Sequence, residues 1–336
     1  AVILPALLRA LDEKTGAPPP VRHAALIALG KVATEASHVE LLRKAVGPSA
    51  DVLHDESGII ALGLLRRSDR ARQFEPGLLD RVRQQLRGIL EDDKRALRTR
   101  TLAGASLGLL GDQPRASVEQ SKALVQGLLD LLPGQRHAMT SAILTAVSLQ
   151  PRASVAAAQR KLLRGILQSG MIGGQKAHLG PSAAAFAIGR VGGDADVHAL
   201  LDAMRRRKGR TSNGARSAAI ALGVLAPRLT TETRAKVIDR LVRALDRAPP
   251  AEDDLRVRPP RLRDETACCA ALVTLARLAA ADVRESAELT EAVTRVDAFL
   301  RRHMESDKPV ERPYAALALA LLVRQMPASS AHAWTP

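Results

Sequence analysis

The stretch Val21–Ala33, with the sequence VRHAALIALGKVA, decides the fold, because degraded copies of it recur along the whole chain. In each copy a small residue stands at the place of Gly30, which we call the reference position. The eight reference positions are Gly30, Gly63, Gly108, Ser148, Gly189, Gly223, Ala276 and Ala320. Their spacing runs from 33 residues (Gly30 to Gly63) to 53 residues (Gly223 to Ala276), and periods of about this size indicate a helical solenoid.

Each copy has the apolar spacing of a helix that packs on other helices. A small or short residue stands two positions before the reference position, an aliphatic residue stands between them, and another aliphatic residue follows two positions later. Only Gln150 breaks the last column. This spacing gives one apolar stripe on a helix. Glycine inside a helix costs about 1 kcal/mol relative to alanine, so its recurrence predicts close helix-to-helix contact, which leucine at Gly223 would overpack.

These blocks resemble the HEAT-repeat family in its short, Ala/Gly-rich bacterial form. The resemblance rests on residues 21–33 and on the related blocks GIIALGLL (58–65) and ARSAAIALGVLA (215–226). An arginine eight positions before the reference position resembles the arginine that often starts the second HEAT helix. The arginines in question are Arg22, Arg100 and Arg312. The resemblance implies an all-α, right-handed, armadillo-like α-solenoid (superhelix) of about eight HEAT-like helix pairs, in one continuous domain over residues 1–336.

The composition favours stacked helices and an acidic partner. Aromatic residues make up only 1% of the chain, so the core must consist of aliphatic side chains. The net charge of +15 favours nucleic acid, an anionic membrane or an acidic protein face, although heavy use of Arg and Ala also reflects GC-rich coding. No run of 18 apolar residues predicts a membrane span. The compartment stays open, because a removed signal peptide would leave no trace in a sequence that begins at Ala1.

Two long loops and one basic turn are each expected between the first and second helix of a repeat. The loops are residues 169–181 (SGMIGGQKAHLGP) and 248–264 (APPAEDDLRVRPPRLRD), and the turn is residues 205–216 (RRRKGRTSNGAR). Such turns align along one edge of a solenoid. We therefore predict a basic, partner-binding edge, with a merely solvated rim as the alternative. Its residues are Arg205, Arg206, Arg207, Lys208, Arg210, Arg256, Arg258, Arg261 and Arg263.

Local signals place several helix ends. Ser37 with Glu40 predicts a capping box for a helix over residues 38–46, and Ser117 with Gln120 predicts another. Asp55 is expected to cap a helix. The adjacent Cys268 and Cys269 are expected to be small buried residues, because neighbouring positions on a helix are poorly placed to bond with each other.

The sequence shows no pattern typical of a catalytic, cofactor or metal site. The histidines have neither His-x-x-x-His nor His-x-x-Glu-His spacing, and the His-Glu pairs of a HEAT-type iron hydroxylase do not occur. Residues 170–176 lack the spacing of a P-loop and are expected to form a flexible turn. Five scattered aromatic residues do not make the cradle that a HEAT-like DNA glycosylase needs. We therefore predict no catalytic, cofactor-binding or metal-binding residues.

The leading hypothesis for function is a non-catalytic HEAT-repeat scaffold that binds another macromolecule, most directly a protein. The first alternative is sequence-independent binding of nucleic acid, in which the basic edge contacts the phosphate backbone. The second alternative is an enzyme of the HEAT class, such as a chromophore-lyase-like protein. The oligomeric state and the identity of the partner are left open by the sequence.

Overall fold

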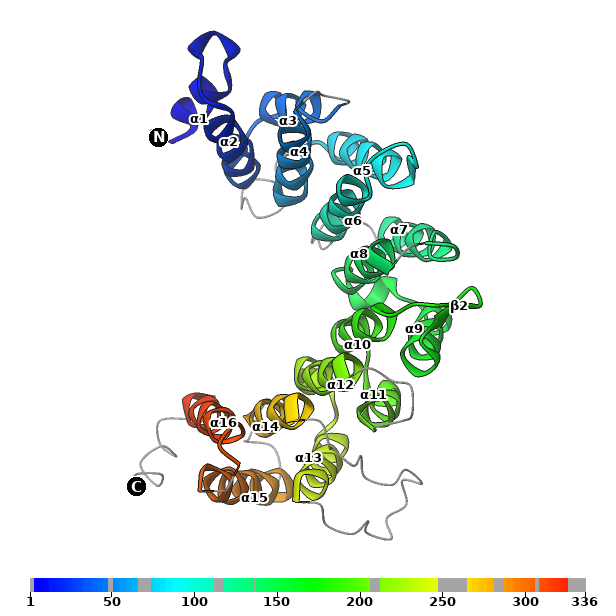
Figure 1. Ribbon diagram of the computed structural model, residues 1–336, viewed down its shortest axis with the longest axis vertical. Coiled ribbons are helices and arrows are strands. Elements are labelled where there is room, and N and C mark those ends of the chain that lie inside the picture. Colours follow the sequence, from blue (N-terminus) through cyan, green and yellow to red (C-terminus); the bar gives the residue numbers. More distant parts are fainter. Residues whose placement is uncertain are drawn as a thin grey trace. The chain divides into compact units, whose positions relative to one another are not determined.

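The computed structural model describes residues 3–47, 51–65, 74–111, 118–135, 137–205, 212–246, 265–280, 287–305 and 308–325. Its α-helices form eight consecutive pairs (Figure 1). The first helices of the pairs are α1 (Ile3–Leu11), α3 (Ala36–Lys44), α5 (Pro76–Glu91), α7 (Val118–Asp130), α9 (Ala157–Ser169), α11 (Val197–Met204), α13 (Thr231–Asp246) and α15 (Ala287–Met304). The second helices are α2 (Pro19–Val32), α4 (Val52–Leu64), α6 (Leu97–Gly111), α8 (His137–Ser148), α10 (Gly180–Val191), α12 (Ser212–Leu225), α14 (Glu265–Ala280) and α16 (Arg312–Gln325).

Short elements occupy some of the connections. Within the described residues these are four 3-10 helices and two strands: η1 (Glu13–Thr15), η4 (Arg152–Ser154), η5 (Asp194–Asp196), η6 (Ala226–Arg228), β1 (Met171–Ile172) and β2 (Gln175–Lys176). Among the described helices, none is long and apolar enough to cross a membrane.

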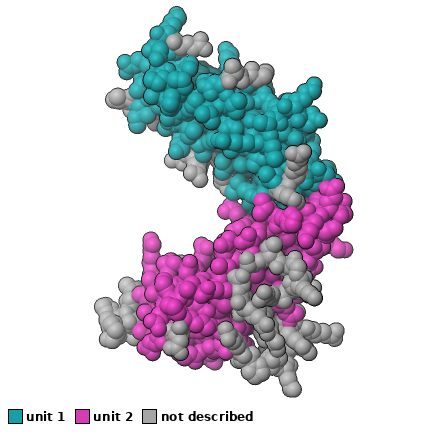
Figure 2. Space-filling model, in the orientation of Figure 1, with its two compact units in different colours: residues 1–156 teal, residues 157–336 magenta. Residues whose placement is uncertain are grey.

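The chain divides into two compact units, unit 1 over residues 1–156 and unit 2 over residues 157–336 (Figure 2). In unit 1, α2 packs on α4, α4 on α6, and α6 on α8. In unit 2, α10, α12, α14 and α16 pack in the same sequential way, and each first helix packs against the second helix of its own pair. Stacking of equivalent second helices defines an α-solenoid, so the predicted all-α fold of about eight helix pairs is confirmed. Its right-handedness and its organisation as one continuous domain stay predictions.

The small reference residues are explained by close contact between neighbouring second helices. A Cβ atom added to Gly108 would lie 2.6 Å from the Cα atom of Ala146, and one added to Gly189 would lie 2.8 Å from the carbonyl oxygen of Ala221. In both cases the residue that is met stands two positions before the next reference position. The pairs with this register are Gly30 with Ala61, Gly63 with Ser106, Gly108 with Ala146, Gly189 with Ala221 and Gly223 with Thr274. The two recurrent small positions are thus the two sides of one contact.

Gln150, the exception in the aliphatic column, caps two helices. Its side chain is buried, and its amide nitrogen donates to the carbonyl oxygens of Ala146 at 3.0 Å and of Gly108 at 3.4 Å. Both carbonyls belong to the last turn of their helices, α8 and α6, where the regular ladder of helix hydrogen bonds ends. The Ala146 carbonyl also accepts from the backbone N–H of Leu149 at 3.3 Å. A polar side chain at this position therefore stabilises the ends of two neighbouring second helices.

Two of the predicted helix caps are wrong. The predicted capping box of Ser37 with Glu40 does not form, because helix α3 begins at Ala36 with Glu35 as its cap. His38 Nδ1 accepts from the backbone N–H groups of Thr34 and Glu35 at 3.3 and 3.2 Å. Glu40 pairs with Arg43 instead, at 2.9 Å. The predicted cap at residue 117 lies outside the described residues.

Asp55 is also not a helix cap. Helix α4 is capped by Asp51, whose Oδ1 accepts from the backbone N–H of His54 at 3.1 Å. Asp55 lies one turn further on, where it is buried and forms an ion pair with Arg95 at 2.7 Å. Burial raises the pKa of Asp55, and the nearby charge of Arg95 opposes that rise.

The glycine-rich segment of residues 169–181 joins α9 to α10, as its position in the repeat predicts, and its first residue and last two residues belong to these helices. It contains a small antiparallel hairpin in place of the flexible turn that the sequence suggested. Strand β1 pairs with β2 through Met171 opposite Lys176 and Ile172 opposite Gln175. Gly173 and Gly174 make the turn at φ of 55° and 78°, values that a two-residue hairpin turn requires and that glycine adopts without strain. The loop of residues 248–264 lies outside the described residues.

A buried polar pair connects α15 with the start of α16. His303 Nε2 lies 3.2 Å from Glu311 Oε2, and both side chains are buried. The ring of Phe299 lies against the imidazole, with the ring centroids 4.4 Å apart. Burial lowers the pKa of His303, with the positive charges of Lys308 and Arg302 acting in the same direction and the carboxylates of Glu311 and Asp246 opposing it.

Candidate functional site

An apolar row runs across the second helices of unit 2. It consists of the residues three positions before each reference position: Phe186, Ile220, Val273 and Leu317. Phe186 is 41% exposed and Leu317 is 50% exposed, while Ile220 and Val273 are partly exposed. The helices α10, α12, α14 and α16 pack one after another (Figure 1). Because the four residues hold the same register in the repeat, we expect them to follow one another across one face of the unit.

A groove lies within this row, over α12, α14 and α16. We call it the unit 2 groove; its volume is about 310 Å³, at the lower end of the range for small binding pockets. Apolar side chains form its floor, among them Ile220, Ala270 and Val273. Tyr314 and Val310 form one side, and both are more than one-third exposed.

Arginine dominates the charge around this groove. The four second helices of unit 2 carry five exposed arginines and one exposed acidic residue, Glu265. The arginines are Arg190, Arg216, Arg277, Arg312 and Arg324. Arg216 and Arg277 line the groove, and neither forms an ion pair with a carboxylate in the described part of the chain. The groove therefore combines an apolar floor with a positive rim.

The first helices of the same unit differ, because several of their arginines are paired. Arg243 lies 2.8 Å from Asp239, and Arg301 lies 3.0 Å from Asp297, in both cases on one helix. Arg302 lies 2.7 Å from Asp246 on the neighbouring first helix. Such pairs compensate one another locally, whereas the groove arginines Arg216 and Arg277 form no ion pair within the described residues.

Of the predicted basic edge, the structure describes only Arg205. It lies at the end of α11, with Nη1 3.8 Å from Asp202 Oδ1. The other eight predicted residues lie outside the described residues, in the segments 206–211 and 247–264. These segments lead directly into α12 and α14, whose first two turns supply Arg216, Glu265 and Cys269 to the groove. The predicted edge and the groove are thus adjacent along the chain, while a partner-binding role for the edge stays a prediction.

The two cysteines are buried, as predicted. Cys268 and Cys269 both lie on α14, and neither is part of a disulfide bond. The Sγ atom of Cys269 lies 3.8 Å from the carbonyl oxygen of Val310, which joins the start of α14 to the turn before α16 at the edge of the groove. The groove residues Ile220, Val273 and Arg277 were not singled out from the sequence, although their positions relative to the reference residues were available there.

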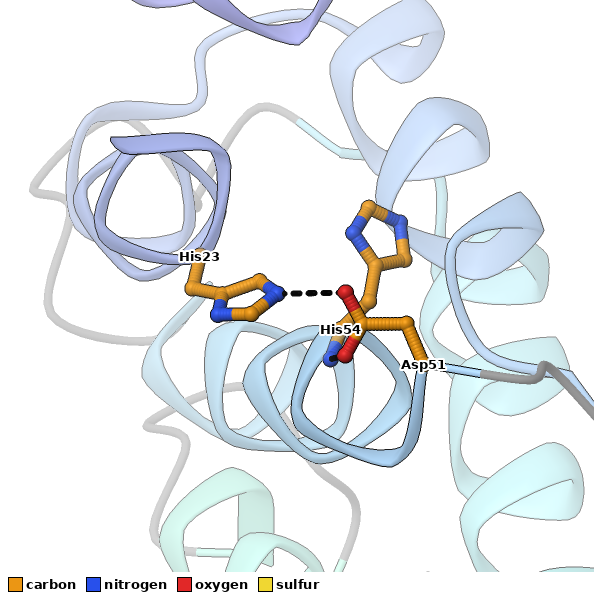
Figure 3. Close-up of side chains that lie close together, drawn as sticks. All are labelled: His23, Asp51 and His54. Atoms are coloured by element: carbon orange, nitrogen blue, oxygen red, sulfur yellow. Dashed lines mark hydrogen bonds and ion pairs between the residues drawn. The ribbon is translucent and has the colours of Figure 1, made fainter. Parts of the chain in front are cut away.

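A second cluster, in unit 1, was missed at the level of sequence. His23 lies on α2, whereas Asp51 and His54 lie at the start of α4. His23 Nε2 is 2.9 Å from Asp51 Oδ2, and one ligand atom from each of the three residues lies within 4.8 Å of the others (Figure 3). We call this the His–Asp–His cluster. The spacing Asp51-x-x-His54 at a helix start was its local signal, but its third member is 28 residues away.

The electrostatics of this cluster follow from its contacts. The hydrogen bond with His23 lowers the pKa of Asp51, and the bond from the backbone N–H of His54 adds to that effect. Burial lowers the pKa of His54; the charge of Asp51 opposes this, while the nearby His23 and Arg22 reinforce it. The imidazoles contact each other edge to face, with centroids 6.0 Å apart.

Helix pairs that stack through equivalent second helices make this protein an α-solenoid. No protein-family profile matches the chain, and no curated protein does so either. Among solved structures, 56 chains are similar.

One similar chain comes from a study of a phosphorylation switch in the interaction between cadherin and β-catenin. The two sequences are 13% identical, the match covers 96% of this chain and 68% of that chain, and the TM-score is 0.38. Another is a designed armadillo repeat protein, which is 15% identical to this chain. That match covers 84% of this chain and 99% of the designed protein, with a TM-score of 0.35. A third is an engineered protein, which is 16% identical to this chain. That match covers 96% of this chain and 99% of the engineered protein, with a TM-score of 0.29.

Proposed function

We propose that this protein is a non-catalytic scaffold whose unit 2 groove binds a segment of another protein. The segment carries apolar side chains that enter the groove and acidic side chains that face its arginines. The observation that carries the proposal is the combination, at one place, of the apolar floor around Ile220 and Val273 with the rim arginines Arg216 and Arg277.

The apolar row favours a peptide as the ligand. Ile220 and Val273 lie in the groove, and the row continues beyond it through Phe186 and Leu317. Peptide-recognition surfaces obtain specificity from pockets that accept alternate side chains of an extended segment, or one face of a helix. Apolar contact supplies most of the driving force, while the arginines select a partner of opposite charge and fix its register.

The groove is less suited to nucleic acid. Interfaces with nucleic acid are more polar than those with protein, and single-stranded binding relies on a series of aromatic side chains that stack on bases. On the described second helices of unit 2, the aromatic side chains are Phe186 and Tyr314, and the positions between them hold Ile220 and Val273. Phosphate binding by the turns of residues 206–211 and 247–264 remains the alternative, and the experiment below separates the two.

The test is a selection of short random peptides, displayed on phage, against the full chain. We expect the selected peptides to be rich in Asp or Glu together with Leu, Ile or Phe. Synthetic, fluorescein-labelled copies should bind in an anisotropy titration. The variant Arg277→Glu should weaken that binding by about tenfold or more, because it places a negative charge beside an acidic ligand.

The matched control is Lys161→Glu. Lys161 is an exposed cation on the first helix α9, away from the groove, so its reversal changes the net charge equally. A second variant, Val273→Asp, places a charge in the apolar floor. The proposal fails if Lys161→Glu and Arg277→Glu have the same effect, or if Val273→Asp leaves the affinity unchanged while the protein stays folded.

Duplex DNA of random sequence provides the rival outcome. Anisotropy is measured for labelled duplex at two salt concentrations. A steep loss of binding with salt, together with a lack of selected peptides, would favour phosphate contacts and would refute protein binding by the groove.

A further inference from the structure

The His–Asp–His cluster lies on the contact between the first two helix pairs, in unit 1. Its members come from neighbouring second helices, with His23 on α2 and with Asp51 and His54 at the start of α4 (Figure 3). The unit 2 groove is built from other residues, so the cluster is independent of the function proposed above.

The three donor atoms suit a transition metal. Imidazole nitrogen is a good ligand for zinc, copper, iron and nickel, and a carboxylate oxygen commonly completes such a set. Two histidines and one acid are also the protein ligands of several zinc sites that keep a fourth position open to water. We propose that His23, Asp51 and His54 bind one divalent transition-metal ion, with zinc as the best-fitting ion.

The distances between the donors are close to what one ion requires. Two ligands on a tetrahedral zinc ion, each about 2.0–2.2 Å from the metal, lie about 3.3 Å apart. His23 Nε2 and Asp51 Oδ2 lie 2.9 Å apart, so an ion can replace the proton that now joins them after a small separation. The three donor atoms all lie within 4.8 Å of one another. The longest distance between two donors therefore exceeds the required separation of about 3.3 Å by about 1.5 Å or less, and rotation of the His54 side chain can close that difference.

The carboxylate is already oriented by a second contact. Asp51 Oδ1 accepts from the backbone N–H of His54, which leaves Oδ2 directed toward His23. Partners of this kind fix the ligands of metal sites and strengthen metal binding. The side chain of Asp51 is 38% exposed and that of His23 is 15% exposed, so the cluster is open to an ion from solvent.

A metal here would link two repeats. Each ligand-bearing helix packs on the other, and the ion would add a direct bond between α2 and α4. Because the three donors come together only in the folded chain, zinc would bind the folded state in preference to the unfolded one and stabilise it by mass action. Arg22 lies near His54 and weakens cation binding, whereas the negative charge of Asp51 favours it.

The test uses zinc chloride alone, titrated into the full chain at neutral pH and followed by calorimetry. We expect one ion per chain. Asp51→Asn removes the carboxylate charge but keeps a good helix cap, so it should fold normally and weaken zinc binding by about tenfold or more. His54→Gln should have a similar effect. The matched control is His198→Gln, which removes an exposed histidine from α11 in unit 2.

A second readout reports the ligands directly. Cobalt(II) takes the place of zinc in such sites, and its visible absorption should appear on binding to the wild type and be lost in Asp51→Asn. Zinc should also raise the thermal unfolding midpoint of the wild type, reversibly on addition of a chelator, and leave that of Asp51→Asn unchanged. The inference is overturned if zinc does not bind, or if Asp51→Asn and His54→Gln bind it as the wild type does.

Discussion

Replacement of Gly108 by alanine tests the backbone contact on which the solenoid depends. A Cβ atom at this position would lie 2.6 Å from Ala146 Cα, 3.1 Å from Ala146 Cβ and 3.1 Å from Leu149 Cδ1. Carbon atoms that are not bonded prefer separations of about 3.5–4.0 Å, so α6 and α8 must separate by about 1 Å. Overpacking of this kind costs about 1–3 kcal/mol.

The same substitution also stabilises the helix, and this contribution must be subtracted from the cost of overpacking. Alanine favours a helix over glycine by about 1 kcal/mol. Because the new atom meets backbone and cannot be relieved by rotation of a side chain, we place the overpacking in the upper half of its range. The net result expected for Gly108→Ala is a loss of about 1–2 kcal/mol in the free energy of unfolding.

Gly88→Ala is the matched control, since Gly88 lies inside α5 of the same unit and an added Cβ atom there meets nothing within 4 Å. It should stabilise the protein by about 1 kcal/mol, from helix propensity alone. Urea unfolding of both variants and the wild type, followed by circular dichroism, gives the comparison. If Gly108→Ala stabilises the protein as Gly88→Ala does, the contact between α6 and α8 is not as close as described, and the reasoning fails.

Three further predictions concern buried polar groups. Gln150→Leu restores the aliphatic column of the repeat but removes donors from two helix-end carbonyls, so we expect a loss of about 1–2 kcal/mol in urea unfolding. Arg164→Met leaves the buried carboxylate of Asp196 without its ion-pair partner, and should cost about 3 kcal/mol, whereas Lys161→Met on the same helix should cost less than about 0.5 kcal/mol. Burial lowers the pKa of His303 below its ordinary value of 6.5, so the unfolded state binds more protons and stability should fall as the pH drops through 6.5 toward that lowered value. His303→Gln should reduce that slope in thermal unfolding measured from neutral to mildly acidic pH, and an unchanged slope would contradict the assignment.

The repeat could be predicted from the sequence because small residues recur at the positions where neighbouring repeats are in contact. Gly108 and Ala146 belong to two such columns, and the structure joins them. The helix caps were harder to predict, because Asp51 and Asp55 both lie near the start of α4 and either is a good capping residue. Only the actual start of the helix decides between them, and that depends on packing of the whole pair.

The His–Asp–His cluster and the groove could not be predicted for a different reason. His23 and Asp51 become neighbours through the stacking of two repeats, and a search for local metal-binding motifs does not test such pairs. Val273 stands in a column whose partial exposure depends on how the neighbouring second helices pack. The fold therefore follows from residues that repeat, whereas both candidate sites depend on residues that differ between repeats.

The close contacts between second helices at Gly189 and Gly223 have a consequence for recognition. No flexible side chain separates α10 from α12 where Gly189 meets the main chain of Ala221, and Thr274 is joined to the Ala219 carbonyl by a 2.7 Å hydrogen bond. The intervals between Phe186, Ile220 and Val273 are accordingly set by close packing of the three helices, which leaves little room for adjustment. The distance between neighbouring second helices therefore sets the distance between the exposed apolar side chains. A substitution of Gly189 or Gly223 would change that distance, and with it the ligand that fits, although no exposed residue is replaced.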